Sequence, residues 1–112
     1  MDCLFCKIVA GDVPAEVLHT TERTVAFRDV DPQAPTHVLV VPREHFANAA
    51  ELAAGDPEAS AELVRTAAAV AAAEGHPDDY RLVLNTGAGA GQTVFHTHLH
   101  VLAGRELAWP PG

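Results

Sequence analysis

Near its C-terminus the chain reads Val94-Phe95-His96-Thr97-His98-Leu99-His100-Val101-Leu102. The β-branched and aromatic residues of this run predict a β-strand. Side chains two positions apart on a strand share a face, so we expect His96, His98 and His100 to project together. Histidine serves as nucleophile, proton donor or metal ligand near neutral pH, and this spacing alone does not separate a catalytic row from a metal-binding row.

The composition predicts a soluble, cytoplasmic protein. The 112 residues favour a single domain spanning 1–112, with 48% hydrophobic and 20% charged residues. A net charge of −8 argues against a nucleic-acid partner, which requires a basic surface. No apolar run reaches the roughly 20 residues of a membrane span, and no signal peptide is evident, so we expect no membrane partner.

Periodicity and capping residues outline the elements around the histidine run. Asp56 is a good N-cap, Pro57 suits the first helical position and Gly75 suits a helix end, so one long helix is expected between them. Its Leu63 and Val64, with Val70, are expected to face the sheet. We expect short helices at 5–10 and 44–52, and strands at 17–19, 24–29, 37–41, 80–85 and 94–102.

This order of elements predicts an α+β fold. Short turns join most of the strands, which favours an antiparallel sheet of about five strands over an alternating βαβ arrangement. One long helix and one or two short helices complete the expected architecture.

Two further motifs carry chemistry. Cys3 and Cys6 form a Cys-x-x-Cys, which in a reducing compartment suggests metal or redox chemistry more than a disulfide. The redox interpretation is weak because the pair does not lie between a strand and a helix, while two cysteines make only half a zinc site. The glycine-rich segment 87–91 is by itself a weak indication of an anion cradle, and more often just a loop.

The run from His96 to Leu102 resembles the histidine triad (HIT) signature, His-φ-His-φ-His-φ-φ, in which φ is apolar. Thr97 departs from the pattern, but it is expected to point away from the triad face. Several further segments resemble the Hint branch of that superfamily: Asn85, Gly91-Gln92-Thr93, residues 26–37 and Trp109-Pro110-Pro111-Gly112.

The resemblance implies a HIT-like fold and a covalent mechanism. His98 would attack the α-phosphorus of a nucleotide and form a nucleotidyl-histidine, with its other ring nitrogen donating to the His96 backbone carbonyl. His100 would contact phosphate oxygens, and His37 would be a fourth active-site histidine. The expected catalytic residues are thus His98, His100, His96 and His37.

The same resemblance implies a nucleotide site. Asp29 would accept hydrogen bonds from the ribose hydroxyls, and Asn85 and Thr93 would contact phosphate. The apolar slot for the base would be Phe5, Ile8, Phe27 and Val30, although such residues also suit a core. The full expected nucleotide-binding set is Phe5, Ile8, Phe27, Asp29, Val30, Asn85, Gly91, Gln92, Thr93, His98, His100 and Trp109.

Some members of the superfamily bind zinc, and the resemblance extends to those ligands. The positions here are Cys3, Cys6, His45 and His96, a closed four-ligand set that implies a structural Zn²⁺ and no organic cofactor. A competing hypothesis is that both cysteines are free thiols. The family is typically a homodimer, in which Trp109 would reach the partner's active site.

The resemblance implies a hydrolase acting on purine nucleoside phosphoramidates or related nucleotides. A second hypothesis is a dinucleoside polyphosphate hydrolase of the Fhit type, which the Hint-like ending disfavours. A third is a nucleotide-binding scaffold with weak catalysis. A fourth is a catalytic metal site built from the histidine row.

Overall fold

The computed structural model describes residues 2–112 and contains one five-stranded antiparallel sheet. The strand order is β1-β2-β3-β5-β4, so β1 and β4 form the two edges. The strands are β1 (Val17–Thr20), β2 (Thr24–Arg28), β3 (Thr36–Pro42), β4 (Arg81–Val83) and β5 (Leu99–Ala103). With its three α-helices, this architecture confirms the predicted α+β class.

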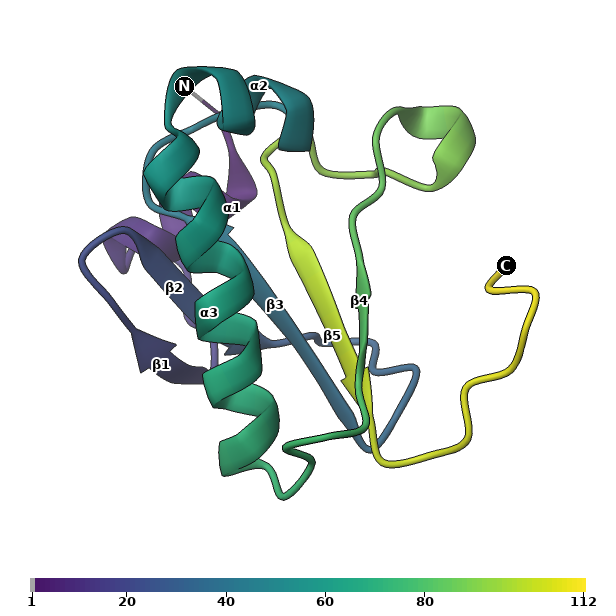
Figure 1. The fold of residues 1–112 in the computed structure, drawn as a ribbon. Helices are drawn as coiled ribbons and strands as arrows, with labels where there is room; N and C mark the ends of the chain where they lie inside the picture. The colour runs from purple at the N-terminus through teal and green to yellow at the C-terminus, as the bar shows by residue number, and fades with distance from the viewer. Residues whose placement is uncertain (1) are drawn as a thin grey trace.

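The long helix α3 (Pro57–Ala73) packs across one face of the sheet (Figure 1). Asp56 caps it by accepting a hydrogen bond from the Ala59 N–H at 3.0 Å, as its sequence predicts. Leu63 and Val70 are buried against the sheet, but Val64 is 51% exposed, so the prediction for Val64 was wrong. Val64 directly follows Leu63, and adjacent residues of a helix project about 100° apart.

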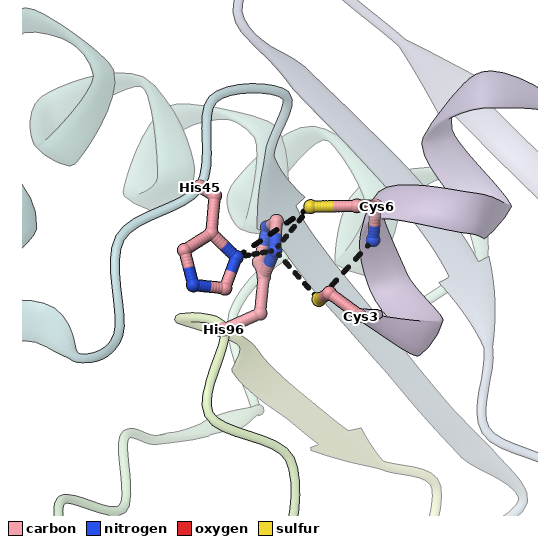
Figure 2. Close-up of side chains that lie close together, drawn as sticks. All are labelled: Cys3, Cys6, His45 and His96. Atoms are coloured by element: carbon pink, nitrogen blue, oxygen red, sulfur yellow. Dashed lines mark hydrogen bonds between the residues drawn. The ribbon is translucent and has the colours of Figure 1, made fainter. Parts of the chain in front are cut away.

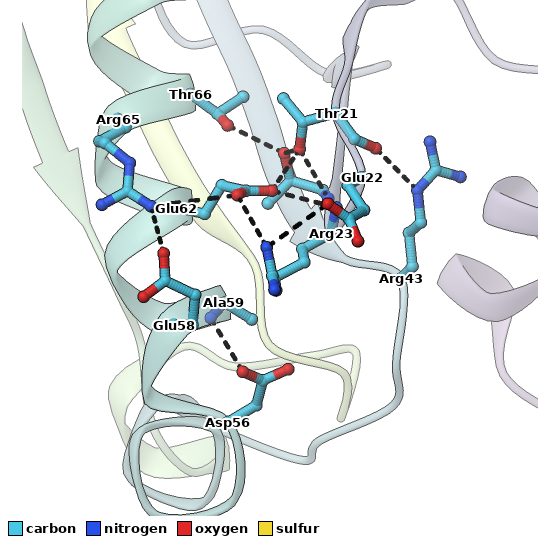
Figure 3. A network of polar contacts seen from close by, with 11 residues as sticks. Thr21, Glu22, Arg23, Arg43, Asp56, Glu58, Ala59, Glu62, Arg65 and Thr66 are labelled. Atoms are coloured by element: carbon cyan, nitrogen blue, oxygen red, sulfur yellow. Dashed lines mark hydrogen bonds and ion pairs between the residues drawn. The ribbon is translucent and has the colours of Figure 1, made fainter.

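A polar network ties α3 to the turn between β1 and β2 (Figure 3). The Thr24 and Thr66 hydroxyls, both buried, lie 2.9 Å apart, and Thr21 Oγ1 lies 2.6 Å from Thr24 Oγ1. Thr21 Oγ1 also donates to the Glu62 carboxylate at 2.6 Å. The buried hydroxyls therefore each have a hydrogen-bond partner, as burial requires.

The short helix α1 (Leu4–Ala10) is associated with the opposite side of the sheet, where a second apolar cluster forms. Its N-cap is Cys3, whose sulfur accepts the Cys6 N–H at 3.4 Å, and its C-cap is Gly11, which has φ of 82°. Every residue of β3 is buried because the strand lies between the two clusters: Val38 and Val40 belong to one, Leu39 and Val41 to the other.

Most predicted bounds shift by only one or two residues, such as those of the strand predicted at 80–85 and observed at 81–83, but two elements differ more. The second helix, α2 (Ala49–Gly55), begins later than predicted because the Asn48 side chain caps it through the Glu51 N–H. The histidine strand was predicted from Val94, but β5 begins only at Leu99. The N–H and hydroxyl of Thr97 instead bond the Phe46 carbonyl, at 2.8 and 2.9 Å, so this residue does not join the ladder.

Among residues 2–112, the helices are all too short or too polar to cross a membrane. The glycine-rich segment, expected as a loop, contains one turn of 3-10 helix, η1 (Ala88–Ala90). The segment that follows β5 passes outside the edge strand β4 (Figure 1).

Candidate functional site

The β3–β5 register brings two histidines of the site together. Leu39 pairs with His100, and His37 lies two residues before Leu39, so His37 and His100 are diagonal neighbours on one face. His37 Nε2 lies 2.9 Å from His100 Nδ1. The Gln33 backbone N–H donates to His37 Nδ1 at 3.0 Å, so Nε2 carries the proton of this neutral ring and donates to His100.

His98 is held in a defined tautomer. Its Nδ1 lies 2.8 Å from the His96 backbone oxygen, which can only accept, so Nδ1 carries the proton and the Nε2 lone pair is free. The Phe5 ring of α1 packs edge-on to the imidazole, with ring centroids 5.0 Å apart. His98 is 8% exposed, so its orientation is fixed by packing as well as by the hydrogen bond.

His98 and His100 line a pocket of about 510 Å³, a size that suits a small organic ligand. One part of its wall is apolar, from α1 and the neighbouring strands. Another part is polar and includes Asp29 and Thr93 beside the two histidines. The pocket can therefore hold a ligand with an apolar body and a polar, anionic end.

The His100 ring at the polar end and the His37 ring beside it are held in the neutral form. Burial, with the neighbouring rings of His98 and His37, lowers the pKa of His100 to about 4. Burial likewise lowers the pKa of His37, although the carboxylate of Asp29 opposes this, with its Oδ2 3.4 Å from His37 Nε2. Neutral rings at neutral pH can donate single N–H groups to a phosphoryl oxygen without carrying charge.

Next to this pocket, two cysteines and two histidines converge (Figure 2). His96 Nδ1 lies 3.5 Å from both the Cys3 and the Cys6 sulfur, and 3.2 Å from His45 Nδ1. Tetrahedral zinc, with Zn–S of about 2.3 Å and Zn–N of about 2.0–2.1 Å, places a sulfur and a nitrogen ligand about 3.6 Å apart and two nitrogens about 3.3 Å apart. The observed spacing fits that geometry.

The tautomer of His96 also fits a metal ligand. Its Nε2 donates to the Pro42 carbonyl at 2.9 Å, which leaves the Nδ1 lone pair directed at the sulfurs, and burial lowers its pKa so that the ring is neutral. Burial raises the pKa of the Cys6 thiol, so a bound cation would have to stabilise the thiolate.

A second group of potential ligands, Asp29, His37 and His100, does not fit a metal equally well. His37 would have to offer Nε2, but this atom carries the proton because Nδ1 accepts the Gln33 N–H. The same test of tautomers therefore supports a metal at the cysteines and a hydrogen-bond network at His37.

Comparison with known proteins identifies the family. Residues 10–107 match the model of the HIT domain. The chain belongs to the HIT family. It is 47% identical over 111 residues to an uncharacterised HIT-like protein of Synechococcus elongatus, covering 99% of this chain and 97% of that one.

Solved structures of HIT proteins show the same fold. A HIT family hydrolase from Legionella pneumophila has a TM-score of 0.94 at 46% identity, covering 99% of this chain and 100% of that chain. A HIT family hydrolase from Clostridium thermocellum has a TM-score of 0.91 at 39% identity, covering 96% and 94%.

Most of the nucleotide-binding residues predicted from the HIT resemblance line the pocket. They are Phe5, Ile8, Phe27, Asp29, Val30, Thr93, His98 and His100. His37 lies behind His100, and His96 contributes its carbonyl to His98 while its ring turns to the cysteines.

Four predicted residues lie outside the pocket wall: Asn85, Gly91, Gln92 and Trp109. The Gln92 side chain is buried and joins its loop to the segment before α2, because Nε2 donates to the Ala47 carbonyl at 2.6 Å and Oε1 accepts the Gly87 N–H at 2.9 Å. The Gln92 side chain is therefore engaged within the protein, and its contact with a nucleotide stays a prediction. Trp109 is 82% exposed on the C-terminal segment, away from the pocket of its own chain.

Several wall residues were not predicted. The connection Val13-Pro14-Ala15-Glu16 between α1 and β1 closes one side of the pocket, and its sequence carries no local signal of that role. Leu39 is also part of the wall. The alternation of β3 could have revealed it, because Leu39 shares a face with His37 and pairs with Phe27.

Proposed function

We propose that this HIT protein is a nucleotide hydrolase that works through a covalent intermediate on His98. The observation that carries the proposal is the His98 Nδ1 contact to the His96 carbonyl, which frees Nε2 as a nucleophile beside a ligand-sized pocket. The solved relatives described as HIT family hydrolases support the reaction class.

The reaction would proceed in two displacements. His98 Nε2 attacks the α-phosphorus, the bond from phosphorus to the leaving group breaks, and the leaving group departs with a proton taken from solvent. Water then attacks the nucleotidyl-histidine and returns a proton to solvent, which releases the nucleoside monophosphate and restores the neutral imidazole. His100 would donate a hydrogen bond to a phosphoryl oxygen as charge develops there.

The pocket suits a nucleotide in particular. Its apolar wall would hold the base between Phe5, Ile8 and Phe27, while Asp29 lies where it could accept hydrogen bonds from the ribose. The overall charge of −8 does not oppose binding of one small anion, because the ligand's phosphate would meet N–H donors rather than carboxylates.

We place the chain in the Hint branch and expect purine nucleoside phosphoramidates as substrates. The support is the resemblance of residues 26–37, Gly91-Gln92-Thr93 and Trp109-Pro110-Pro111-Gly112 to that branch. The competing substrate class is dinucleoside polyphosphates, in which the enzyme would break a P–O bond rather than a P–N bond.

The test is turnover of adenosine and guanosine phosphoramidates by the wild type and by His98→Ala. We expect at least a ~1,000-fold loss of kcat on removal of the nucleophile. His19→Ala is the matched control, because His19 is exposed on β1 and lies outside the pocket. Undiminished turnover by His98→Ala would refute the mechanism, and faster turnover of dinucleoside polyphosphates would change the substrate class. If the wild type binds nucleotides but turns over neither phosphoramidates nor dinucleoside polyphosphates, the protein would be a nucleotide-binding scaffold.

We also propose a structural Zn²⁺ held by Cys3, Cys6, His45 and His96. The four ligand atoms lie within 4.8 Å of one another, and the set is complete without water. When bound, zinc would fasten α1 to the segment that precedes β5 and would supply no open position for chemistry.

A homodimer is the expected assembly. β4 is an edge strand, and Leu84 beside it and Val64 on α3 are both exposed, which provides apolar surface for a second copy. The exposed Trp109 could then reach the partner's pocket. Light scattering after size exclusion should give twice the 11.8 kDa chain mass, and a monomer would contradict this proposal.

A further inference from the structure

The segment that follows β5 contacts the loop that precedes β3. Arg105 Nε donates to the Gln33 carbonyl at 2.8 Å, and its Nη1 donates to the Glu106 carbonyl at 2.9 Å. Gly104 packs so closely on Pro35 that a Cβ at this glycine would lie 2.9 Å from the Pro35 Cβ. Residues 104–105 therefore brace the loop from outside the pocket.

Gln33 is bonded at both of its backbone groups. Its carbonyl accepts from Arg105, and its N–H donates to His37 Nδ1 at 3.0 Å. The side-chain amide of Gln33 donates to the Asp31 carbonyl at 3.0 Å, and the Asp31 N–H donates to Asp29 Oδ1 at 2.8 Å. The loop thus presents one N–H donor to His37 in a fixed position.

The Gln33 N–H determines which ring nitrogen of His37 carries the proton. With Nδ1 accepting, Nε2 donates to His100 Nδ1 at 2.9 Å, and the proton of the neutral His100 must then lie on Nε2. Without the Gln33 donor, the proton of the neutral His37 ring could lie on either nitrogen, and an Nε2–H could turn from His100 to the Asp29 carboxylate, whose Oδ2 lies 3.4 Å from His37 Nε2. His100 Nδ1 would then lose its donor, and both tautomers of His100 would be populated.

We propose that Arg105 is a positioning residue for the active site. Its hydrogen bond to Gln33 holds the loop that sets the tautomer of His37, and through it the N–H that His100 presents to the ligand. The role in turnover rests on the proposed function, whereas the role in the tautomers does not. The order of contacts is Arg105, Gln33, His37, His100.

Arg105→Ala, Arg105→Lys and the control Arg65→Ala would test this proposal. Arg65 is an exposed arginine of α3 that pairs with Glu58, so its removal changes the net charge by the same amount as removal of Arg105. Long-range ¹H–¹⁵N correlation spectra of labelled protein report which nitrogen of each histidine carries the proton. We expect His37 protonated at Nε2 in the wild type and in Arg65→Ala, but mixed tautomers of His37 and His100 in Arg105→Ala.

Arg105→Lys retains a donor and a charge, so it should restore most of the wild-type spectrum. In turnover, kcat of Arg105→Ala should fall about tenfold with KM changed less, which is the magnitude of one hydrogen bond to a charged donor. If Arg105→Ala unfolds, the comparison rests on Arg105→Lys, whose amide spectrum should match that of the wild type and so show that it is folded. The change in the tautomers of His37 and His100 should be smaller in this variant.

Unchanged tautomers in both Arg105 variants would overturn the proposal whatever the activity. Changed tautomers with unchanged kcat would overturn the positioning role. Changed tautomers in a protein whose wild type hydrolyses no nucleotide would refute the proposed function but leave the Arg105 contacts to His37 and His100 established.

Discussion

The backbone oxygen of His96 accepts a hydrogen bond from His98 Nδ1 at 2.8 Å, while the His96 ring lies 3.5 Å from two cysteine sulfurs. One residue therefore joins the candidate metal centre to the candidate nucleophile. Metal binding at the ring would restrain the same backbone that fixes the tautomer of His98. The two sites are adjacent but chemically separate, because the ring serves one and the carbonyl the other.

Loss of a ligand should remove the metal. We expect about one zinc per wild-type chain, and almost none in Cys3→Ser or His45→Ala, because a structural site needs all four ligands. His76→Ala, which lies outside the ligand cluster, is the control and should keep its zinc. Elemental analysis of protein purified without added metal gives the ratio.

Metal loss should also lower stability. Chelation of the wild type should lower the midpoint of thermal unfolding, since α1 and the segment before β5 would lose their common attachment. The same chelator should leave Cys3→Ser unchanged. A wild type that contains no zinc and two reduced cysteines would contradict the metal assignment.

Stability should fall in mild acid because His100 is neutral and partly buried. Its pKa is lowered to about 4 from the usual value near 6.5, so the unfolded chain takes up a proton first as the pH falls. The contribution is complete above about pH 6.5 and is lost progressively toward pH 4. Between about pH 7 and pH 5 we expect a loss of about 1–2 kcal/mol from this residue.

Urea unfolding of the wild type, His100→Asn and His19→Asn at those two pH values would measure this loss. The wild type and His19→Asn should show the same acid sensitivity, and His100→Asn should show less. An equal pH dependence in all three proteins would mean that His100 does not contribute.

Local patterns predicted much of this fold. Asp56 and Pro57 mark the start of α3 through a cap that depends only on neighbouring residues. The strand β3 likewise follows from the apolar residues at 38–41, and the burial of both of its faces agrees with their apolar character. These features are local, so the sequence contains them in full.

Other features depend on distant contacts and could not be predicted. Thr97 leaves the strand pattern because it bonds the carbonyl of Phe46, 51 residues away. His45 and His96 meet by the same long-range packing, and only the resemblance to a family suggested that they would. The Gln92 side chain joins the Gly87 N–H of its own loop to the Ala47 carbonyl, 45 residues away, and no spacing rule reveals that contact.

The threonine network beneath α3 should contribute to stability and not to catalysis. Thr66→Val keeps the shape of the side chain but removes the hydroxyl that lies 2.9 Å from Thr24 Oγ1, so we expect a loss of about 1–2 kcal/mol in the free energy of unfolding. Thr20→Val is the control, because Thr20 is exposed on β1 and should change stability little. Denaturant unfolding measures both, and equal effects would show that the buried hydroxyl contributes nothing specific.

Asp29 offers a test of ribose recognition that separates binding from structure. Its Oδ1 accepts the Asp31 N–H at 2.8 Å, and asparagine can retain that bond through its own Oδ1. Asp29→Asn should therefore fold normally but lose the charged acceptor at Oδ2. For a ribonucleoside substrate we expect KM to rise about tenfold or more, as for the loss of a charge-assisted hydrogen bond. The matching 2′,3′-dideoxynucleoside substrate lacks both hydroxyls, so the wild type and Asp29→Asn should bind it alike. If the variant weakened both substrates equally, Asp29 would act on His37 rather than on the ribose, since its Oδ2 lies 3.4 Å from that ring.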